Sequence, residues 1–162
     1  MIRNKVLGWP ALKRKLAADR RAGRKIVFTN GVFDILHAGH LKVFEKSAAL
    51  GDRLIVGMNS DASVRRLKGP NRPIVGQAER ALLVAGLVPV DYVTFFSDDT
   101  PAKLIEMIRP DVLVKGGDYK VGQIVGREHS KRVVRIPLVK GRSSTNIIAK
   151  VVKAYGRRRG RS

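Results

Sequence analysis

The sequence contains no cysteine, and only 6% of its 162 residues are aromatic. Without cysteine the chain forms no disulfide, has no thiol nucleophile and offers no thiolate to a zinc ion. This absence fits a cytoplasmic protein. The scarcity of aromatic side chains counts against a nucleic-acid-binding module that stacks bases on an aromatic platform.

Long apolar runs are also missing. No apolar stretch approaches the roughly 18 residues that a membrane-spanning helix requires, and residues 1–5 lead into a basic segment rather than an apolar signal region. We therefore expect a cytoplasmic protein that does not associate with a membrane. The chain is 44% hydrophobic, which is enough for one domain with a substantial core.

Acidic residues are few, because 13 Asp and Glu face 33 Lys and Arg, a formal net charge of +20. Residues 1–25 hold nine basic residues and one Asp, and residues 153–162 hold five basic residues and no acidic one. We expect residues 156–162 to form a basic, flexible tail. The smaller excess between the two ends suits an anionic small molecule at least as well as a polynucleotide, so no specific nucleic-acid partner is expected.

Short apolar runs and amphipathic stretches follow one another along the chain. The apolar runs predict buried strands and the amphipathic stretches predict helices. The expected strands are residues 25–29, 53–58, 92–96, 112–114 and 133–136. The expected helices are residues 10–21, 37–50 with Gly51 as C-cap, about 61–67, 76–87 and 101–108, and a last helix carrying Ile148, Val151, Val152 and Tyr155 on one face.

This alternation predicts the fold class, an α/β, Rossmann-like doubly wound parallel sheet of about five strands flanked by helices. We expect a basic N-terminal helix, residues 1–24, packed on one domain formed by residues 25–155. In such sheets the ligand binds where the carboxyl ends of the strands meet. The polar segments 29–40, 59–61, 115–119 and 140–144 should therefore lie at one edge.

Two common phosphate-binding motifs are not found. Gly117 and Gly122 have the spacing of a P-loop, but Gln123 follows in place of the lysine that the motif requires. No Gly-x-Gly-x-x-Gly follows the first expected strand either. Kinase-type P-loop chemistry and ordinary dinucleotide binding are therefore both disfavoured.

Two histidines follow the first expected strand instead. His37 and His40 are three residues apart at the start of a helix, which puts both imidazoles on one face beside free backbone N–H groups. That arrangement suits an anion. Alone, the pair could equally lie on the surface, but residues 30–34 and Gly39 around it favour a catalytic site.

Residues 29–40 resemble the Asn-Gly-x-Phe-Asp-x-x-His-x-Gly-His signature of the HIGH-type nucleotidylyltransferases, which transfer a nucleoside monophosphate from a nucleoside triphosphate to a phosphate group. Over about residues 25–150 the chain is similar to the D-glycero-β-D-manno-heptose 1-phosphate adenylyltransferases, which make ADP-heptose for lipopolysaccharide. Further matching stretches are residues 59–69, 72–73, 79–80, 115–119 and 143–146. The resemblance implies that residues 25–155 form a nucleotidylyltransferase domain.

The resemblance implies roles on the nucleotide side. His37 and His40 would stabilise charge developing on the α-phosphate, and Lys42 would bind phosphates of either substrate. The other implied nucleotide-binding residues are Asn30, Gly31, Phe33, Asp34, Gly39, Lys115, Gly116, Asp118, Arg142, Ser143, Ser144 and Thr145. Two alternatives stay open here, because Asp34 could be an orienting residue and the two serines could only cap a helix.

On the acceptor side, Lys68, Arg72 and Arg80 would bind the sugar phosphate, or would belong to a solvated basic face. Asn59 and Asp61 would touch the sugar or cap a helix. No metal site made by protein ligands is expected, since a magnesium ion would arrive with ATP and keep much of its coordination on phosphate and water. The acceptor phosphate is already ionised, so catalysis rests mainly on bringing anions together in line.

The expected reaction joins ATP and D-glycero-β-D-manno-heptose 1-phosphate to give ADP-heptose and pyrophosphate. Related enzymes often carry a fused sugar-kinase domain, for which this chain is too short, so we expect a separate heptose kinase to supply the acceptor. We also expect a homo-oligomer. The alternatives are another acceptor or base, such as glycerol 3-phosphate with CTP, and, from a different class, a nucleic-acid-binding module.

Overall fold

The protein is described here by a computed structural model that covers residues 1–117, 121–137 and 143–156. Five parallel strands form one sheet in the order β3-β2-β1-β4-β5. The strands are β1 (Ile26–Gly31), β2 (Arg53–Asn59), β3 (Tyr92–Phe96), β4 (Val112–Gly116) and β5 (Arg132–Ile136). The predicted Rossmann-like fold is confirmed. Because the strand order reverses between β1 and β4, the carboxyl ends of these two strands flank the crevice where such folds bind ligands.

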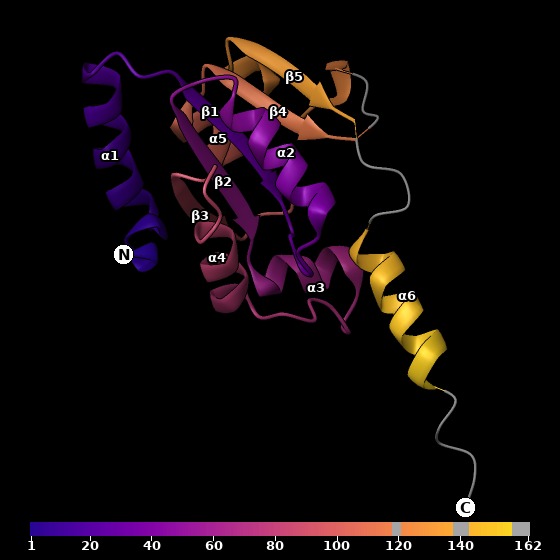
Figure 1. Cartoon of the computed structure of the whole chain (residues 1–162). Coiled ribbons are helices and arrows are strands. Elements are labelled where there is room, and N and C mark those ends of the chain that lie inside the picture. The colour runs from indigo at the N-terminus through magenta and orange to yellow at the C-terminus, as the bar shows by residue number, and fades with distance from the viewer. Residues whose placement is uncertain (118–120, 138–142, 157–162) are drawn as a thin grey trace, which may run out of the picture.

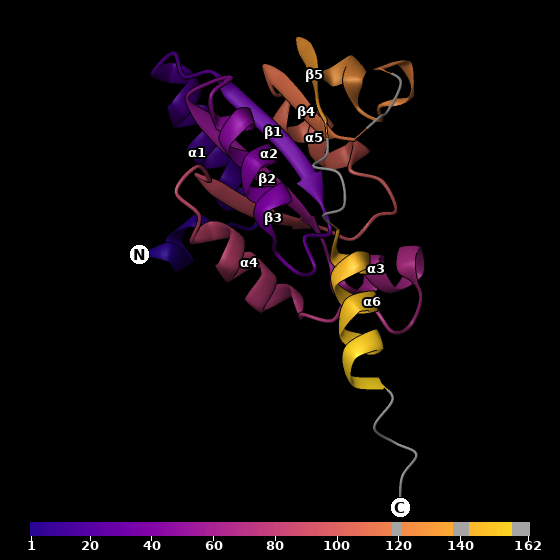
Figure 2. The same cartoon turned by 45° about the vertical axis from the view of Figure 1, so that its right-hand side comes forward.

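Helices cover both faces of the sheet. They are α1 (Trp9–Arg21), α2 (Ala38–Ala48), α3 (Asp61–Lys68), α4 (Gln77–Ala85), α5 (Ala102–Ile108) and α6 (Ser144–Tyr155), with short 3₁₀ turns η1 (Ile2–Lys5), η2 (Val121–Gln123) and η3 (Arg127–His129). In Figure 1 and Figure 2, α2 and α4 lie on one face, while α1 and α5 lie on the other.

Alternate strand residues build a separate core on each face. Val27 and Val56 pack with Phe44 of α2 and Val84 of α4 on one side. On the other side, Ile26, Phe28 and Ile55 pack with residues of α1 and α5 such as Leu12 and Ile105. Since both faces are covered, the strands are continuous apolar runs rather than alternating ones.

The N-terminal segment is fixed to the outer edge of the sheet. Val6 forms a parallel bridge with Val93, and the Trp9 indole Nε1 donates to the Phe95 carbonyl oxygen at 2.8 Å. Leu12 and Leu16 then bury the apolar stripe of α1. Trp9 thus anchors α1 by a hydrogen bond to β3.

Two predicted boundaries of α2 differ in the structure. The helix begins at Ala38 rather than His37, and its C-cap is Ala49 rather than Gly51. Gly51 is needed for another reason, because a Cβ there would lie 2.7 Å from Val27 Cγ2 and 2.8 Å from the Lys25 carbonyl oxygen. Glycine therefore allows the turn after α2 to pass close to the start of β1.

The last helix differs from the others. No residue of α6 is buried, and the helix points away from the sheet (Figure 1, Figure 2). Its predicted apolar face is largely solvent-exposed, since Val151 is 52% exposed and Tyr155 is 71% exposed. Among the residues that the structure describes, no helix combines the length and the apolar character needed to cross a bilayer.

Candidate active site

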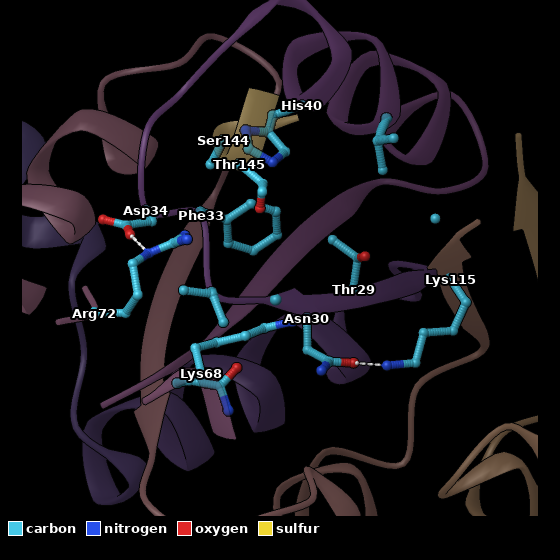
Figure 3. A pocket seen from close by; sticks show the side chains of 15 residues that line it. Thr29, Asn30, Phe33, Asp34, His40, Lys68, Arg72, Lys115, Ser144 and Thr145 are labelled. Atoms are coloured by element: carbon cyan, nitrogen blue, oxygen red, sulfur yellow. Dashed lines mark hydrogen bonds and ion pairs between the residues drawn. The ribbon is translucent and has the colours of Figure 1, made fainter. Parts of the chain in front are cut away.

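A cavity of about 390 Å³ lies at the carboxyl edge of the sheet. Figure 3 shows His40, Ser144 and Thr145 on one side of it and Lys68 and Lys115 on the other. The residues that line it are Thr29, Asn30, Gly31, Val32, Phe33, Asp34, His40, Val43, Asn59, Lys68, Arg72, Lys115, Gly116, Ser144 and Thr145. The polar segments expected at one edge therefore contribute to a single cavity.

The two histidines lie face to face at the start of α2. His37 is the N-cap, and its Nδ1 atom accepts a hydrogen bond from the Gly39 backbone N–H at 3.1 Å. Its ring stacks on that of His40 with centroids 3.8 Å apart. Phe33 packs against His40 in an edge-on geometry at 5.2 Å. The predicted proximity of the imidazoles is thus present, although His37 precedes the helix.

His40 is poised to respond to an anion. Burial, followed by the charge of His37, lowers the pKa of His40 from 6.5 to about 4. Its Nδ1 atom is buried and has no hydrogen-bond partner within the described part of the chain. A phosphate near the ring would favour the protonated imidazole and would raise this pKa. An anion bound beside this ring would therefore favour the protonated form of His40.

The N-terminus of α6 faces the same cavity. The Ser143 hydroxyl accepts from the Asn146 backbone N–H at 3.1 Å and caps the helix. Ser143 is not among the residues that line the cavity. The Ser144 hydroxyl donates to the Ile35 carbonyl oxygen at 3.1 Å and ties α6 to the loop after β1. Thr145 lines the cavity beside it. Because a helix N-terminus favours negative charge, this end of α6 suits phosphate groups.

Lys115 and Asn30 meet across the ends of β4 and β1. The Lys115 ammonium donates to the Asn30 side-chain oxygen at 2.9 Å. Burial lowers the pKa of Lys115 from its ordinary value. Gly116 follows Lys115 on the cavity wall, and Lys68 at the end of α3 adds a second ammonium group. The floor of the cavity is therefore cationic.

Asp34 orients a neighbouring loop. Its carboxylate is 2% exposed and accepts from Arg72 Nε at 2.6 Å and from the backbone N–H groups of Ile74 and Val75 at 2.8 and 2.9 Å. Burial alone would raise its pKa, but these three donors outweigh burial and lower it. Since its oxygens are occupied, the structure favours the orienting role that the sequence left open, with Arg72 as the group held at the cavity.

Arg80 does not reach the cavity. Its side chain is completely buried and donates to the carbonyl oxygens of Val32 and Asn59 and to the Asp61 carboxylate. These acceptors lie after β1, at the end of β2 and at the start of α3, and the guanidinium from α4 donates a hydrogen bond to each. The expected contact of Arg80 with the acceptor phosphate is therefore corrected to a structural one, and Asp61 is engaged in the same ion pair at 2.7 Å.

Three further predicted residues that the structure describes also fall outside the cavity lining. His37 and Gly39 support it from the start of α2, while Lys42 is exposed on that helix, because residues two apart point in different directions. Asp118 and Arg142 lie outside the described residues. Conversely, the cavity lining includes three residues that the sequence did not single out, Thr29, Val32 and Val43. Only their closeness in sequence to Asn30 and His40 could have indicated that they line the site.

The donor set determines what a divalent cation could bind here. Among residues 1–117, 121–137 and 143–156, no group of three or more His, Asp or Glu side chains could hold a metal ion. The Asp34 carboxylate is taken by Arg72 and two backbone groups. The described side chains of this cavity therefore offer a polyanion cationic groups and hydroxyls rather than a cluster of carboxylates.

Comparison with known proteins agrees with this chemistry. The profile of the cytidylyltransferase-like proteins matches residues 28–150. The chain belongs to the cytidylyltransferase-like family. The match runs from β1 into α6 and so includes every described element that lines the cavity. This membership makes the chain a nucleotidyltransferase.

Curated proteins similar to this cytidylyltransferase-like chain include the "Bifunctional protein HldE" of Geobacter sulfurreducens, 52% identical over 156 residues, and that of Wolinella succinogenes, 52% identical over 147 residues. These alignments cover 94% and 91% of the chain but 32% and 31% of the relatives, so the chain spans about a third of their length. A solved lipopolysaccharide core biosynthesis protein from Thermoplasma volcanium matches with a TM-score of 0.60 and 30% identity, over 73% of this chain and 100% of that one.

Proposed function

We propose that the chain transfers AMP from ATP to D-glycero-β-D-manno-heptose 1-phosphate, giving ADP-heptose and pyrophosphate for the inner core of lipopolysaccharide. The observation that carries this proposal is the single cavity in which His40, the N-terminus of α6 and three basic side chains converge. The HldE relatives and the lipopolysaccharide core biosynthesis protein support a heptose acceptor.

The reaction requires little proton transfer. A phosphate oxygen of the acceptor attacks the α-phosphorus of ATP, the bond to the β-phosphate oxygen breaks, and pyrophosphate leaves with the electron pair. We assign His40, supported by His37, to the charge that develops on the α-phosphate. Ser144 and Thr145 at the start of α6 would hold the β- and γ-phosphates.

The remaining groups would place the acceptor and the nucleoside. Lys68 and Arg72 would hold the acceptor phosphate, because both line the cavity and Asp34 fixes the direction of Arg72. Lys115 and Gly116 would form the wall beside the ribose and base. Magnesium, when bound with ATP, would neutralise charge on the triphosphate.

The chemistry of the acceptor also bears on its supply. A heptose 1-phosphate can be made by a kinase that phosphorylates the free anomeric hydroxyl, and we propose that a separate heptose kinase acts before this step. We propose that both steps take place in the cytoplasm, with no specific nucleic-acid partner.

The test is a substrate panel. Purified protein with ATP, magnesium and D-glycero-β-D-manno-heptose 1-phosphate should release pyrophosphate and form ADP-heptose, measured by a coupled assay and mass spectrometry. CTP in place of ATP, and glycerol 3-phosphate in place of the heptose phosphate, provide the comparison. Turnover with CTP and glycerol 3-phosphate, and none with ATP and a heptose 1-phosphate, would overturn the proposal and would indicate that the chain is a cytidylyltransferase.

A further inference from the structure

A second cavity, of about 300 Å³, adjoins the first. The two share Asn30, Asn59 and Lys115. The second is otherwise formed by the end of β3, the connection from β3 to α5, the C-terminal end of α3 and the segment around η2. His40 and the start of α6 line the first cavity alone. The hydrogen bond between Lys115 and Asn30 therefore lies at the boundary between two compartments.

The chemistry of the second cavity differs from that of the first. It presents a carboxylate from Asp99, a hydroxyl from Thr100 and a carboxamide from Gln123, beside apolar walls from Leu67 and Phe96. All three polar side chains are exposed. Arg66 Nε binds one Asp99 oxygen at 2.9 Å, and the other oxygen has no hydrogen bond from the described residues. A free carboxylate oxygen repels phosphate but accepts hydrogen bonds from hydroxyl groups.

The position of Lys68 links the two compartments. Lys68 lines the first cavity and its neighbour Leu67 lines the second, both at the end of α3. A sugar phosphate whose phosphate is held by Lys68 and Arg72 in the first cavity can thus extend its ring past the end of α3 into the second. The volume of about 300 Å³ lies within the range of about 300 to 1,000 Å³ that small-molecule sites have, which is enough for one sugar ring.

We propose that the second cavity binds the polyhydroxyl ring of the acceptor sugar, and that Asp99, Thr100 and Gln123 determine which sugar is accepted. This assignment rests on the proposed function, because it takes the acceptor to be a sugar phosphate. It adds a group of specificity residues that belong to no recognisable motif.

Two nearly isosteric variants test the assignment. Thr100→Val and Gln123→Met each remove hydrogen-bonding capacity and keep the approximate side-chain size. Each should raise KM for D-glycero-β-D-manno-heptose 1-phosphate about 3- to 10-fold, the effect of one hydrogen bond between neutral groups, and leave KM for ATP unchanged. An acceptor that lacks one ring hydroxyl should bind the unaltered protein more weakly. In the variant that has lost the partner of that hydroxyl, the same acceptor should cause no further rise in KM, because both changes remove one hydrogen bond.

Ser97→Ala is the matched control, since Ser97 is exposed at the start of the β3–α5 connection and lines neither cavity. Active unaltered protein with unchanged acceptor KM in both variants would overturn the sugar assignment and leave the proposed function intact. A rise in KM for ATP instead would place the nucleotide base in the second cavity and would also overturn it. No ADP-heptose from the unaltered protein would reject the proposed function itself, and the sugar assignment with it.

Discussion

The two edges of the sheet use charged side chains in opposite ways. At the amino edge, aspartates are hydrogen bonded to the framework of the fold. Asp52, Asp91 and Asp111 each accept a backbone N–H at the start of a strand, at 2.7, 2.8 and 2.8 Å. The buried Asp19 pairs with Arg24 at 2.6 Å and with Arg53 at 3.2 Å, which joins α1 to β2. Charge at this edge is balanced within the protein.

At the carboxyl edge, positive charge is left for a ligand. Lys68 and Lys115 line the cavity, and the N-terminus of α6 adds its own partial charge. The buried carboxylate of Asp34 at this edge forms its ion pair with Arg72, and not with Lys68 or Lys115. The chain has only 13 acidic residues, and their use at the amino edge contributes to this imbalance. Substitutions at the two edges should therefore separate turnover from stability.

The largest expected effect comes from His40→Ala at the carboxyl edge. Loss of an imidazole that stabilises transition-state charge should lower kcat about 10²- to 10³-fold, measured as pyrophosphate release under saturating substrates. The midpoint of urea unfolding should change little. His129→Ala is the control, because His129 lies away from the cavity, after β4. A kcat within threefold of the unaltered protein would remove His40 from the mechanism.

Asp34→Asn should affect both properties, because Asp34 is a buried structural group at the functional edge. The carboxamide offers one acceptor oxygen for three donors, so the free energy of unfolding should fall by about 1–3 kcal/mol. The released Arg72 should raise the acceptor KM more than the KM for ATP. Urea unfolding and steady-state kinetics measure the two effects.

Asp98→Asn is the control for this carboxylate, since Asp98 forms an exposed ion pair with Lys103. Pairs of this kind contribute about 0–1 kcal/mol. If both substitutions lowered the free energy of unfolding equally, the burial of Asp34 would not make its interactions more stabilising than those of an exposed aspartate.

Asp19→Asn should lower stability alone. The variant weakens two arginine pairs and the hydrogen bond from the Tyr92 hydroxyl, and should reduce the free energy of unfolding by about 1–2 kcal/mol. Because Asp19 lies at the opposite edge from the cavity, kcat and both KM values should stay unchanged below the unfolding transition. A selective change in kcat would contradict the separation of the two edges.

Much of the fold was predictable because each strand and helix follows from the pattern of apolar residues within a short segment. Each predicted strand and helix is present, with ends that agree within about two residues. The loops that meet at the carboxyl edge follow from the rule that strands of one parallel sheet end together. The exposed face of α6 did not follow, since an amphipathic pattern does not identify what its apolar side contacts.

Side-chain partners were the part that local pattern could not supply. Lys68 and Arg80 are both basic residues within the matching stretches, yet one lines the cavity and the other is buried against Val32, Asn59 and Asp61. A partial signal existed, because Arg80 is four residues before Val84 and shares its buried helix face. Thr100 and Gln123 gave no signal, since segments distant in sequence bring them to one cavity.

A pH dependence also distinguishes the two edges. The folded-state pKa of His40 is lowered to about 4 from 6.5, so between these pH values the unfolded chain binds a proton that folded His40 does not. Stability from this group is complete above pH 6.5 and is lost as the pH falls toward 4. The pKa of Asp19 is lowered from 3.8, and its contribution is lost only below that value. Unfolding free energies from pH 7 to 4.5 should therefore fall less steeply in His40→Ala than in the unaltered protein, while Asp19→Asn should leave the slope in this window unchanged.

In NMR titrations, a non-hydrolysable ATP analogue should raise the pKa of His40, because its phosphates stabilise the imidazolium. An unchanged pKa with the analogue bound would mean that the triphosphate lies away from this histidine.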